Sequence, residues 1–234
     1  MSLLVRSWNV YQGMTSPHTR RNYLEQAVRL IASDHPDVVC LQEVPLWGRR
    51  RLEGWSDMRL IWNSTRRVWF PPGLGGWITR LDQGFFRSAV SGQANAILLD
   101  RRLEPLERRR VVISRGRRER RICQAVRLHG MVIANLHASG VAGQPEIGAA
   151  ETLRALTFAE SLCRPGDVLI LAGDFNLRPK QLPDLPGFSP PGPGIDQILV
   201  RGAEASALDV WPLAHRTIAA GVLSDHAPVE LRVG

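Results

Sequence analysis

One short apolar segment that ends in polar residues constrains this chain more than any other. Residues 168–172 read Val-Leu-Ile-Leu-Ala and are closed by Gly173, with Asp174 and Asn176 directly after. A run of this length, partly β-branched, predicts a strand buried on both faces. Side chains two residues apart at a strand end lie on the same side. The segment predicts a carboxylate and an amide held together at a sheet edge; the alternative is an Asp/Asn loop that caps the next turn.

The length and composition indicate one globular domain. The chain has 234 residues, 44% of them hydrophobic, and we expect a single domain over residues 1–234. No stretch is apolar enough for a membrane span, and the amino terminus does not resemble a signal peptide, so the sequence indicates a cytoplasmic protein. The three cysteines, Cys40, Cys123 and Cys163, lie far apart in apolar segments and predict buried free thiols.

The net charge of +8 favours a polyanionic partner such as nucleic acid. Almost all basic residues are arginine, with lysine only at Lys180, and a GC-rich genome can produce the same skew. Many arginines surround a hairpin predicted near residues 111–128, whose alternative interpretation is a charged edge that blocks aggregation. Four of them are our candidate nucleic-acid-binding residues: Arg117, Arg118, Arg120 and Arg121.

Tryptophans are concentrated between residues 45 and 93 and are interleaved with arginines. This combination suits base stacking and phosphate contact, so the segment is a candidate wall facing the substrate. For each single tryptophan the alternative is packing against the core. The tryptophans in question are Trp47, Trp55, Trp62, Trp69 and Trp77.

Two helices are expected among the strands. The first has apolar residues at helical spacing up to Ile31, and Ser16-Pro17 predicts its start. The second is expected over residues 147–163, with Leu153 and Leu156 on its buried side. Many short strands with few helices predict a two-sheet core with helices outside.

Polar residues follow the other predicted strands in the same way. The set is Asn9, Glu43, His137, Asp174, Asn176, Asp196, Asp225 and His226. An acid-rich group with two histidines and no cysteine favours a hard cation, Mg²⁺ or Mn²⁺, held by oxygen ligands. The histidines would also permit zinc, against which the number of carboxylates argues.

Six segments carry a family resemblance. They are Trp8-Asn9-Val10, Leu41-Gln42-Glu43-Val44, Asn135-Leu136-His137, Gly173-Asp174-Phe175-Asn176, Ile195-Asp196-Gln197-Ile198 and Ser224-Asp225-His226-Ala227-Pro228. In this order they resemble the successive motifs of the endonuclease/exonuclease/phosphatase superfamily and span nearly the whole chain. The resemblance implies an α/β fold, a four-layer α/β/β/α sandwich with two packed mixed sheets, and the site at their shared edge. It also implies metal-dependent hydrolysis of phosphoesters.

The resemblance further implies roles for the metal ligands and for the water. Glu43 would be the main metal ligand, helped by Asn9 and Asp225. Asp174, oriented by Asn176, would position or deprotonate the attacking water.

The two histidines receive roles in the same way. Asp196 would hydrogen-bond His226 and raise its basicity. The resemblance leaves open whether Asp174 or the Asp196–His226 pair is the base. His137 would donate to a phosphate oxygen or to the leaving group. No glutamate partner for His137 is evident, and Asn95 is the nearest candidate.

The expected function is therefore a divalent-metal-dependent nuclease that hydrolyses phosphodiester bonds in DNA, or in RNA, by metal-assisted attack of water. The positive charge, the arginine hairpin and the tryptophan-rich segment favour this nuclease hypothesis, with DNA as the favoured substrate. The alternative is a phosphatase or phosphodiesterase for lipid or small-molecule phosphoesters. A binding protein without catalysis is a third hypothesis, against which the complete set of acids and histidines argues.

Overall fold

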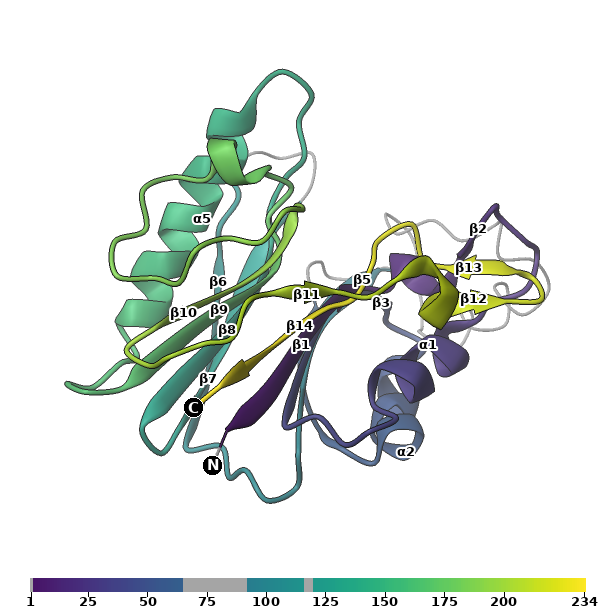
Figure 1. The fold of residues 1–234 in the computed structure, drawn as a ribbon, viewed down its shortest axis with the longest axis horizontal. Helices are drawn as coiled ribbons and strands as arrows, with labels where there is room; N and C mark the ends of the chain where they lie inside the picture. Colours follow the sequence, from purple (N-terminus) through teal and green to yellow (C-terminus); the bar gives the residue numbers. More distant parts are fainter. Residues whose placement is uncertain (1, 65–91, 116–119) are drawn as a thin grey trace.

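The computed structural model of the chain describes residues 2–64, 92–115 and 120–234. Two mixed β-sheets pack face to face, with helices on their outer faces (Figure 1). The two packed mixed sheets expected from the sequence are therefore present. A third, small sheet, which the sequence did not predict, lies at the end that carries β2 in Figure 1.

The six-stranded sheet brings the first and last strands together. Its order is β11-β14-β1-β3-β5-β4. The strands are β1 (Leu3–Asn9), β3 (Val38–Pro45), β4 (Arg59–Ser64), β5 (Gln93–Leu99), β11 (Asp209–Val210) and β14 (Val229–Val233). β1 runs parallel to β3 and antiparallel to β14, so the ends of β1 and β3 lie at one edge, beside the loop that precedes β14.

The five-stranded sheet aligns three candidate residues in one row. Its order is β10-β9-β8-β7-β6. The strands are β6 (Glu107–Val112), β7 (Ile122–Leu128), β8 (Met131–His137), β9 (Val168–Asp174) and β10 (Asp196–Arg201). β8 pairs with β9 in parallel, with His137 opposite Asp174. β10 pairs with β9 in the antiparallel sense, with Asp196 opposite Asp174.

The small sheet changes where the first helix begins. It contains β2 (Thr15–Ser16), β12 (Thr217–Ile218) and β13 (Gly221–Leu223). Ser16 thus lies in a strand, and the helix α1 (Leu24–Ile31) starts eight residues later than Ser16. The prediction of a helix start at Ser16-Pro17 is wrong because Ser16 pairs with Val222 of β13, and α1 begins only after Tyr23, its N-cap.

The long helix α5 (Pro145–Glu160) covers the five-stranded sheet, and α1 with α2 (Leu52–Ser56) covers the other (Figure 1). Leu153, which the periodicity placed on the buried side of α5, is 43% exposed. The helix is rotated because Glu151 faces inward, where its Oε2 accepts the Ser139 N–H at 2.6 Å. α5 therefore anchors the loop that follows His137.

Short 3₁₀ segments complete the described structure. They are η1 (Tyr11–Gly13), η2 (Arg49–Arg51), η4 (Pro179–Gln181) and η5 (Leu213–Arg216). No described helix is long and apolar enough to cross a bilayer. All three cysteines are free thiols, and Cys40 and Cys123 are buried as predicted. Cys163 is only half-buried, so the burial predicted for it is not confirmed.

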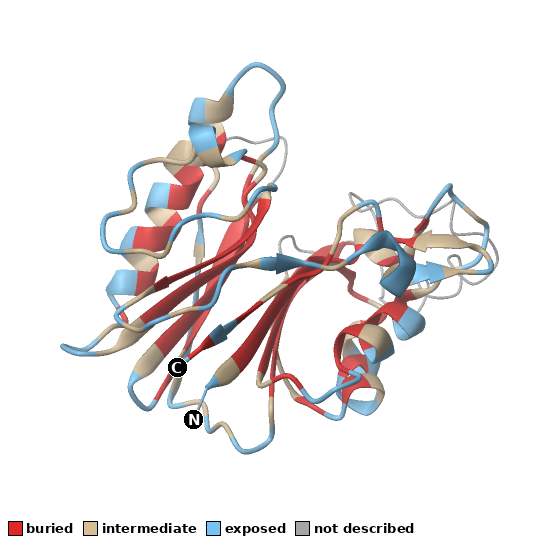
Figure 2. Ribbon diagram, viewed as in Figure 1, coloured by how far each residue is buried: buried red, intermediate tan, exposed pale blue. Residues whose placement is uncertain are grey.

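Buried residues are concentrated on the strands and on the inward sides of the helices (Figure 2). Trp47, Trp55 and Trp62 pack partly buried against the core between α1 and the six-stranded sheet. The packing interpretation therefore applies to these three tryptophans. Trp69 and Trp77 lie outside the described residues.

Gly173 allows β9 to pass close to β8 just before the predicted site. Its φ of +141° is one that residues with a side chain rarely adopt, and a Cβ there would collide with the carbonyl oxygen of Leu136. This glycine therefore sets the position of Asp174 through main-chain contact.

Gly173→Ala is expected to destabilise the fold by about 3 kcal/mol or more, because β8 and β9 would have to separate. The measurement is the urea unfolding midpoint. Gly54→Ala is the control, since Gly54 lies in α2 with nothing within 4 Å of its added Cβ. The control should raise stability by about 0.5–1 kcal/mol. Equal midpoints for the two variants would contradict the close approach of the strands.

Candidate active site

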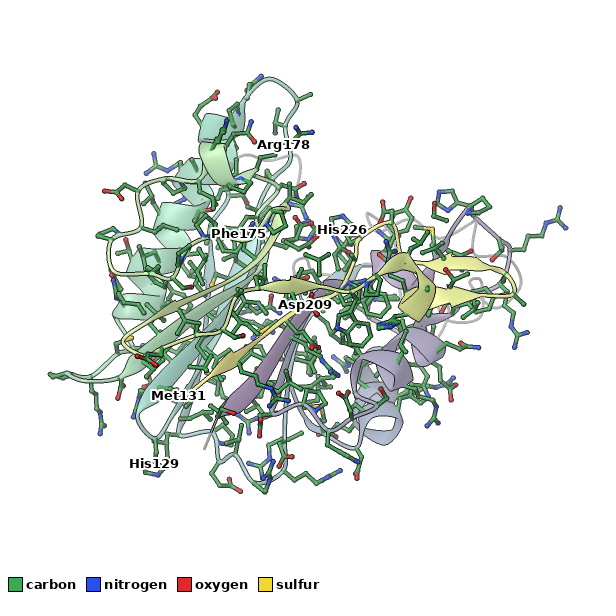
Figure 3. The ribbon with its side chains drawn as sticks, in the orientation of Figure 1. His129, Met131, Phe175, Arg178, Asp209 and His226 are labelled. Atoms are coloured by element: carbon green, nitrogen blue, oxygen red, sulfur yellow. The ribbon has the colours of Figure 1, made fainter. Side chains whose placement is uncertain are left out.

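The eight candidate residues lie at one end of the two sheets, although they are spread over the whole sequence. His226 and Phe175 mark this end in Figure 3, and His129 and Met131 mark the opposite end. The ends of β1, β3, β8 and β9 supply four of the eight side chains, which are Asn9, Glu43, His137 and Asp174. The start of β10 and the loops after β9 and before β14 supply Asp196, Asn176, Asp225 and His226.

Asp174 is the centre of this arrangement and is only 1% exposed. Its Oδ2 accepts a hydrogen bond from Asn9 Nδ2 at 3.0 Å, and its Oδ1 accepts the Asn176 N–H at 2.9 Å. The same Oδ2 lies 3.4 Å from His137 Nε2 and 3.9 Å from His226 Nε2. One carboxylate thus faces two imidazoles and is held by both sheets, because Asn9 belongs to the six-stranded sheet.

His226 is fixed from several sides. Its Nδ1 lies 2.8 Å from Asp196 Oδ2, the pairing that the family resemblance implied. Its backbone N–H donates to Ser224 Oγ at 3.0 Å, and its carbonyl accepts the Trp8 indole N–H at 2.9 Å. The Asp196 contact directs the remaining nitrogen, Nε2, toward Asp174.

The two histidines have opposite pKa shifts. Burial lowers the pKa of His226, but the hydrogen bond to Asp196 and the nearby carboxylate charges outweigh it and raise this pKa to about 9. Burial, aided by the charges of Arg121 and His226, keeps the pKa of His137 well below its ordinary value. At neutral pH His226 is therefore a cation and His137 is neutral, so the His137–Asp174 contact is not an ion pair.

Burial and the charge of Asp196 raise the pKa of Asp174 to about 7. Burial also raises the pKa of Glu43, against the opposing charge of Arg121. Two desolvated carboxylates in one site favour a bound proton or a bound cation. A metal-dependent hydrolase would place a cation between these carboxylates.

A β-bulge turns Glu43 into the site. The pairing of β3 with β5 shifts register between Leu41 and Val44, and Glu43 has a left-handed φ of 55°. Its Oε2 accepts from Gln12 Nε2 at 3.0 Å, and its Oε1 lies 3.9 Å from His137 Nε2. Gln12 could not be predicted as a partner of Glu43 from the sequence, because this contact depends on the turn after β1.

Asn9 and Asp225 differ in their hydrogen bonds and in their exposure to solvent. The amide oxygen of Asn9 accepts the Tyr11 N–H at 3.0 Å, while its NH₂ group donates to Asp174. Asp225 is exposed, with Oδ1 3.5 Å from Ser224 Oγ. Its oxygens thus remain accessible at the rim of the site.

The donors present fit a divalent cation. One ligand atom each from Asp174, Asp196 and His226 lies within 4.8 Å of the others. Asp196 Oδ1 is buried and accepts no hydrogen bond in the described part of the chain. Carboxylate oxygens are the ligands that Mg²⁺ and Mn²⁺ prefer. The group is therefore a candidate metal site, beside the ligand set expected around Glu43.

Of the four arginines predicted to bind nucleic acid, the structure describes two, and these two differ in exposure. Arg121 is buried, with Nη1 within 2.9 Å of both ring nitrogens of His137, whereas Arg120 is exposed. Arg117 and Arg118 lie outside the described residues. Asn95, the candidate partner of His137, instead donates to the Ile122 carbonyl at 3.2 Å.

Asp196→Asn is expected to lower the pKa of His226 from about 9 toward its ordinary value, because the carboxylate that retains the proton is lost. NMR titration of the His226 ring protons in chelator-treated protein measures this. Asp209→Asn, an exposed carboxylate on β11, should leave the titration unchanged.

The raised pKa of His226 also makes the free energy of unfolding depend on pH. A histidine pKa raised in the fold stabilises it fully below the unfolded value of 6.5, and this contribution is lost as the pH rises through about 9. The Asp196→Asn variant should lack this dependence between those two values. Identical titrations in the two proteins would show that Asp196 does not control His226.

Comparisons with known proteins agree with this geometry. The model of the Endonuclease/Exonuclease/phosphatase family matches residues 7–226. No curated protein matches the chain in sequence.

Several solved structures share the fold. Truncated TDP2 from Caenorhabditis elegans superposes with a TM-score of 0.70 at 14% identity, covering 100% of this chain and 97% of that one. D. rerio TDP2 complexed with a single-strand DNA product gives 0.66 at 16% identity, covering 100% and 99%. An endonuclease/exonuclease/phosphatase from Beutenbergia cavernae gives 0.69 at 17% identity, covering 99% and 71%.

The family match spans nearly the whole chain, and the site combines buried acids with two histidines at the edge of two packed sheets. The chain therefore belongs to the endonuclease/exonuclease/phosphatase family and is a phosphoester hydrolase with a candidate divalent-metal site.

Proposed function

We propose that the chain is a divalent-metal-dependent nuclease that hydrolyses phosphodiester bonds, with DNA as the favoured substrate. The observation that carries this proposal is the environment of Asp174: a buried carboxylate within 3.9 Å of His137 and His226 and bonded to Asn9. Such a cluster supplies a base, an acid and a hydrogen-bond donor within the space of one phosphoryl group.

The metal assignment extends the prediction made from the sequence. Glu43, with Asn9 and Asp225, would hold Mg²⁺ or Mn²⁺, and the Asp174–Asp196–His226 group is the other candidate position. When bound, the cation would neutralise phosphate charge and stabilise the charge that grows in the transition state. The Asn9 oxygen already accepts from the Tyr11 N–H, and its second lone pair is the one it would offer to the cation.

The protonation states favour Asp174 as the base over the Asp196–His226 pair. A pKa of about 7 lets Asp174 accept a proton from the attacking water near neutral pH. His226, with a pKa of about 9, already carries its proton and can donate it to the leaving oxygen. Neutral His137 can donate its single N–H to a phosphate oxygen.

Two observations support nucleic acid as the substrate: the net positive charge of the chain and its structural similarity to a protein solved with DNA. The chain carries a net charge of +8, and D. rerio TDP2, which shares the fold, was solved with a single-strand DNA product. Three exposed arginines, Arg108, Arg109 and Arg110, lie on β6. Since β6 is the edge of its sheet, these arginines also suit the edge-protection interpretation and weigh little for DNA.

A substrate panel tests the proposal. Supercoiled plasmid, single-stranded DNA, RNA and a phosphomonoester are incubated with Mg²⁺ or Mn²⁺, and product formation is followed. We expect cleavage of DNA that chelator abolishes, and a loss of about 10²–10⁴-fold in Asp174→Ala because the base is removed. Asp184→Ala, a carboxylate in the loop after η4, is the control and should retain full rate.

Two outcomes would contradict the proposal. Release of phosphate from the monoester with nucleic acids left intact would favour the phosphatase alternative. Retention of DNA without turnover, with or without metal, would favour a binding protein.

The position of the metal is tested by Mn²⁺ binding, measured by calorimetry without substrate. Glu43→Gln is expected to weaken Mn²⁺ binding about tenfold or more, because it removes a charged ligand. Asp196→Asn should weaken it less, since Asp196 is engaged with His226. If Asp196→Asn weakened Mn²⁺ binding more than Glu43→Gln does, the cation would be assigned to the Asp174–Asp196–His226 group instead.

A further inference from the structure

We propose that Arg216 is a positioning residue for the reaction: its guanidinium fixes the peptide group between Ser224 and Asp225, and through it the place of His226 in the site. The inference rests on the proposed phosphodiesterase function. Arg216 lies outside the set of residues that the sequence indicated, in a segment with no motif of its own.

Arg216 is the last residue of η5 and directly precedes β12. Its Nη1 donates to the Ser224 carbonyl at 2.9 Å and to the Leu223 carbonyl at 3.2 Å. Leu223 ends β13, which lies between β12 and β2 in the small sheet (Figure 1). One guanidinium therefore connects η5 to the chain where it leaves the small sheet for the active site.

Ser224 is held by hydrogen bonds at each of its polar groups and is only 2% exposed. Its N–H donates to the Met14 carbonyl at 3.1 Å, and its Oγ donates to the Asn9 carbonyl at 2.7 Å. The same Oγ accepts the His226 N–H at 3.0 Å. The bond from Arg216 to the Ser224 carbonyl completes this set, so the turn joins the end of β1 to the loop that carries His226.

The backbone conformation of Ser224 explains why its carbonyl needs a strong donor. Its φ of 61° is left-handed, which is unfavourable for a residue with a side chain. The Ser224 carbonyl and the Asp225 N–H belong to one peptide group, so a donor that fixes the carbonyl also fixes the direction of the chain into Asp225. Hydrogen bonds from a charged donor are stronger than those from a neutral one and can offset the unfavourable φ.

Arg216 is half-buried beside Asp225. Burial lowers the pKa of the guanidinium, and the nearby charge of Asp225 opposes this shift. An arginine nevertheless stays protonated at any pH that the fold tolerates. The two contacts to the carbonyls therefore persist across the pH range in which the site would act.

The alternative is that Arg216 only attaches η5 to the small sheet, through Leu223, with no effect on the active site. The two roles predict different consequences of removing the guanidinium. A positioning role requires a local loss of order at Ser224 and His226 together with a slower chemical step, whereas an attachment role requires neither.

The experiment compares wild type with Arg216→Met, which keeps much of the side-chain length but has no donor, and with Arg216→Lys. Amide hydrogen exchange in chelator-treated protein should be about tenfold faster at Ser224 and His226 in Arg216→Met. The amides of β9, a strand inside its sheet, should keep their rates.

Kinetics on a single-stranded DNA oligonucleotide give the second measurement. We expect Arg216→Met to lower kcat about 10–100-fold with little change in KM, because the residue acts on the placement of His226 and not on substrate binding. Arg216→Lys should recover part of both losses. Arg164→Met, an exposed arginine before β9, is the matched control and should keep the exchange rates and kcat of wild type.

Unchanged exchange at Ser224 and His226 in Arg216→Met would overturn the proposal, and so would faster exchange with a wild-type kcat. Exchange accelerated equally in β9 would show a general loss of stability and would also reject the positioning role. If wild type cleaves no diester, the proposed function fails, and the exchange rates alone decide whether Arg216 holds the loop. Should Arg216→Met unfold, Arg216→Lys is used, and exchange and kcat equal to those of wild type in that variant would reject the role.

Discussion

Buried amide hydrogen bonds join the two sheets beneath the site and hold the two sheets in a defined position relative to each other. Asn135 Nδ2 donates to the carbonyls of Leu41 and Ala96 at 3.0 and 2.9 Å, and Gln42 Nε2 donates to Asn135 Oδ1 at 2.9 Å. Apolar packing between the sheets tolerates sliding, whereas these directional bonds in a low dielectric do not. The Asn9–Asp174 bond continues the series into the site itself.

The site is electrostatically costly, as functional sites often are. Buried carboxylates lie close together, and the backbone is left-handed at Glu43, Asn176 and Ser224, with φ of 55°, 52° and 61°. A β-bulge and two loops thus hold unfavourable backbone conformations around one site. The surrounding strands, which are apolar and well paired, supply the stability that maintains them. A ligand that neutralises the carboxylates should stabilise this region in particular.

The strands and their polar ends could be predicted from the sequence. An apolar run indicates that a strand is buried, and the acid directly after it indicates where that side chain lies, without any contact distant in sequence. What failed depended on contacts distant in sequence. The start of α1 was misplaced because Ser16 pairs with Val222 of β13, and the rotation of α5 depends on Glu151 reaching Ser139. Arg121 could be assigned to the hairpin, but its burial beside His137 depends on how β7 and β8 pair at the end far from their connecting turn.

The close approach of β9 to β8 at Gly173 has a consequence for how such an enzyme can diversify. Because main chain rather than side-chain packing sets the place of Asp174, that carboxylate is insulated from changes in the surrounding loops. Loops around the rim can then lengthen, shorten or change composition without displacing the reacting atoms. This separation lets one scaffold acquire new specificities while its chemistry stays constant.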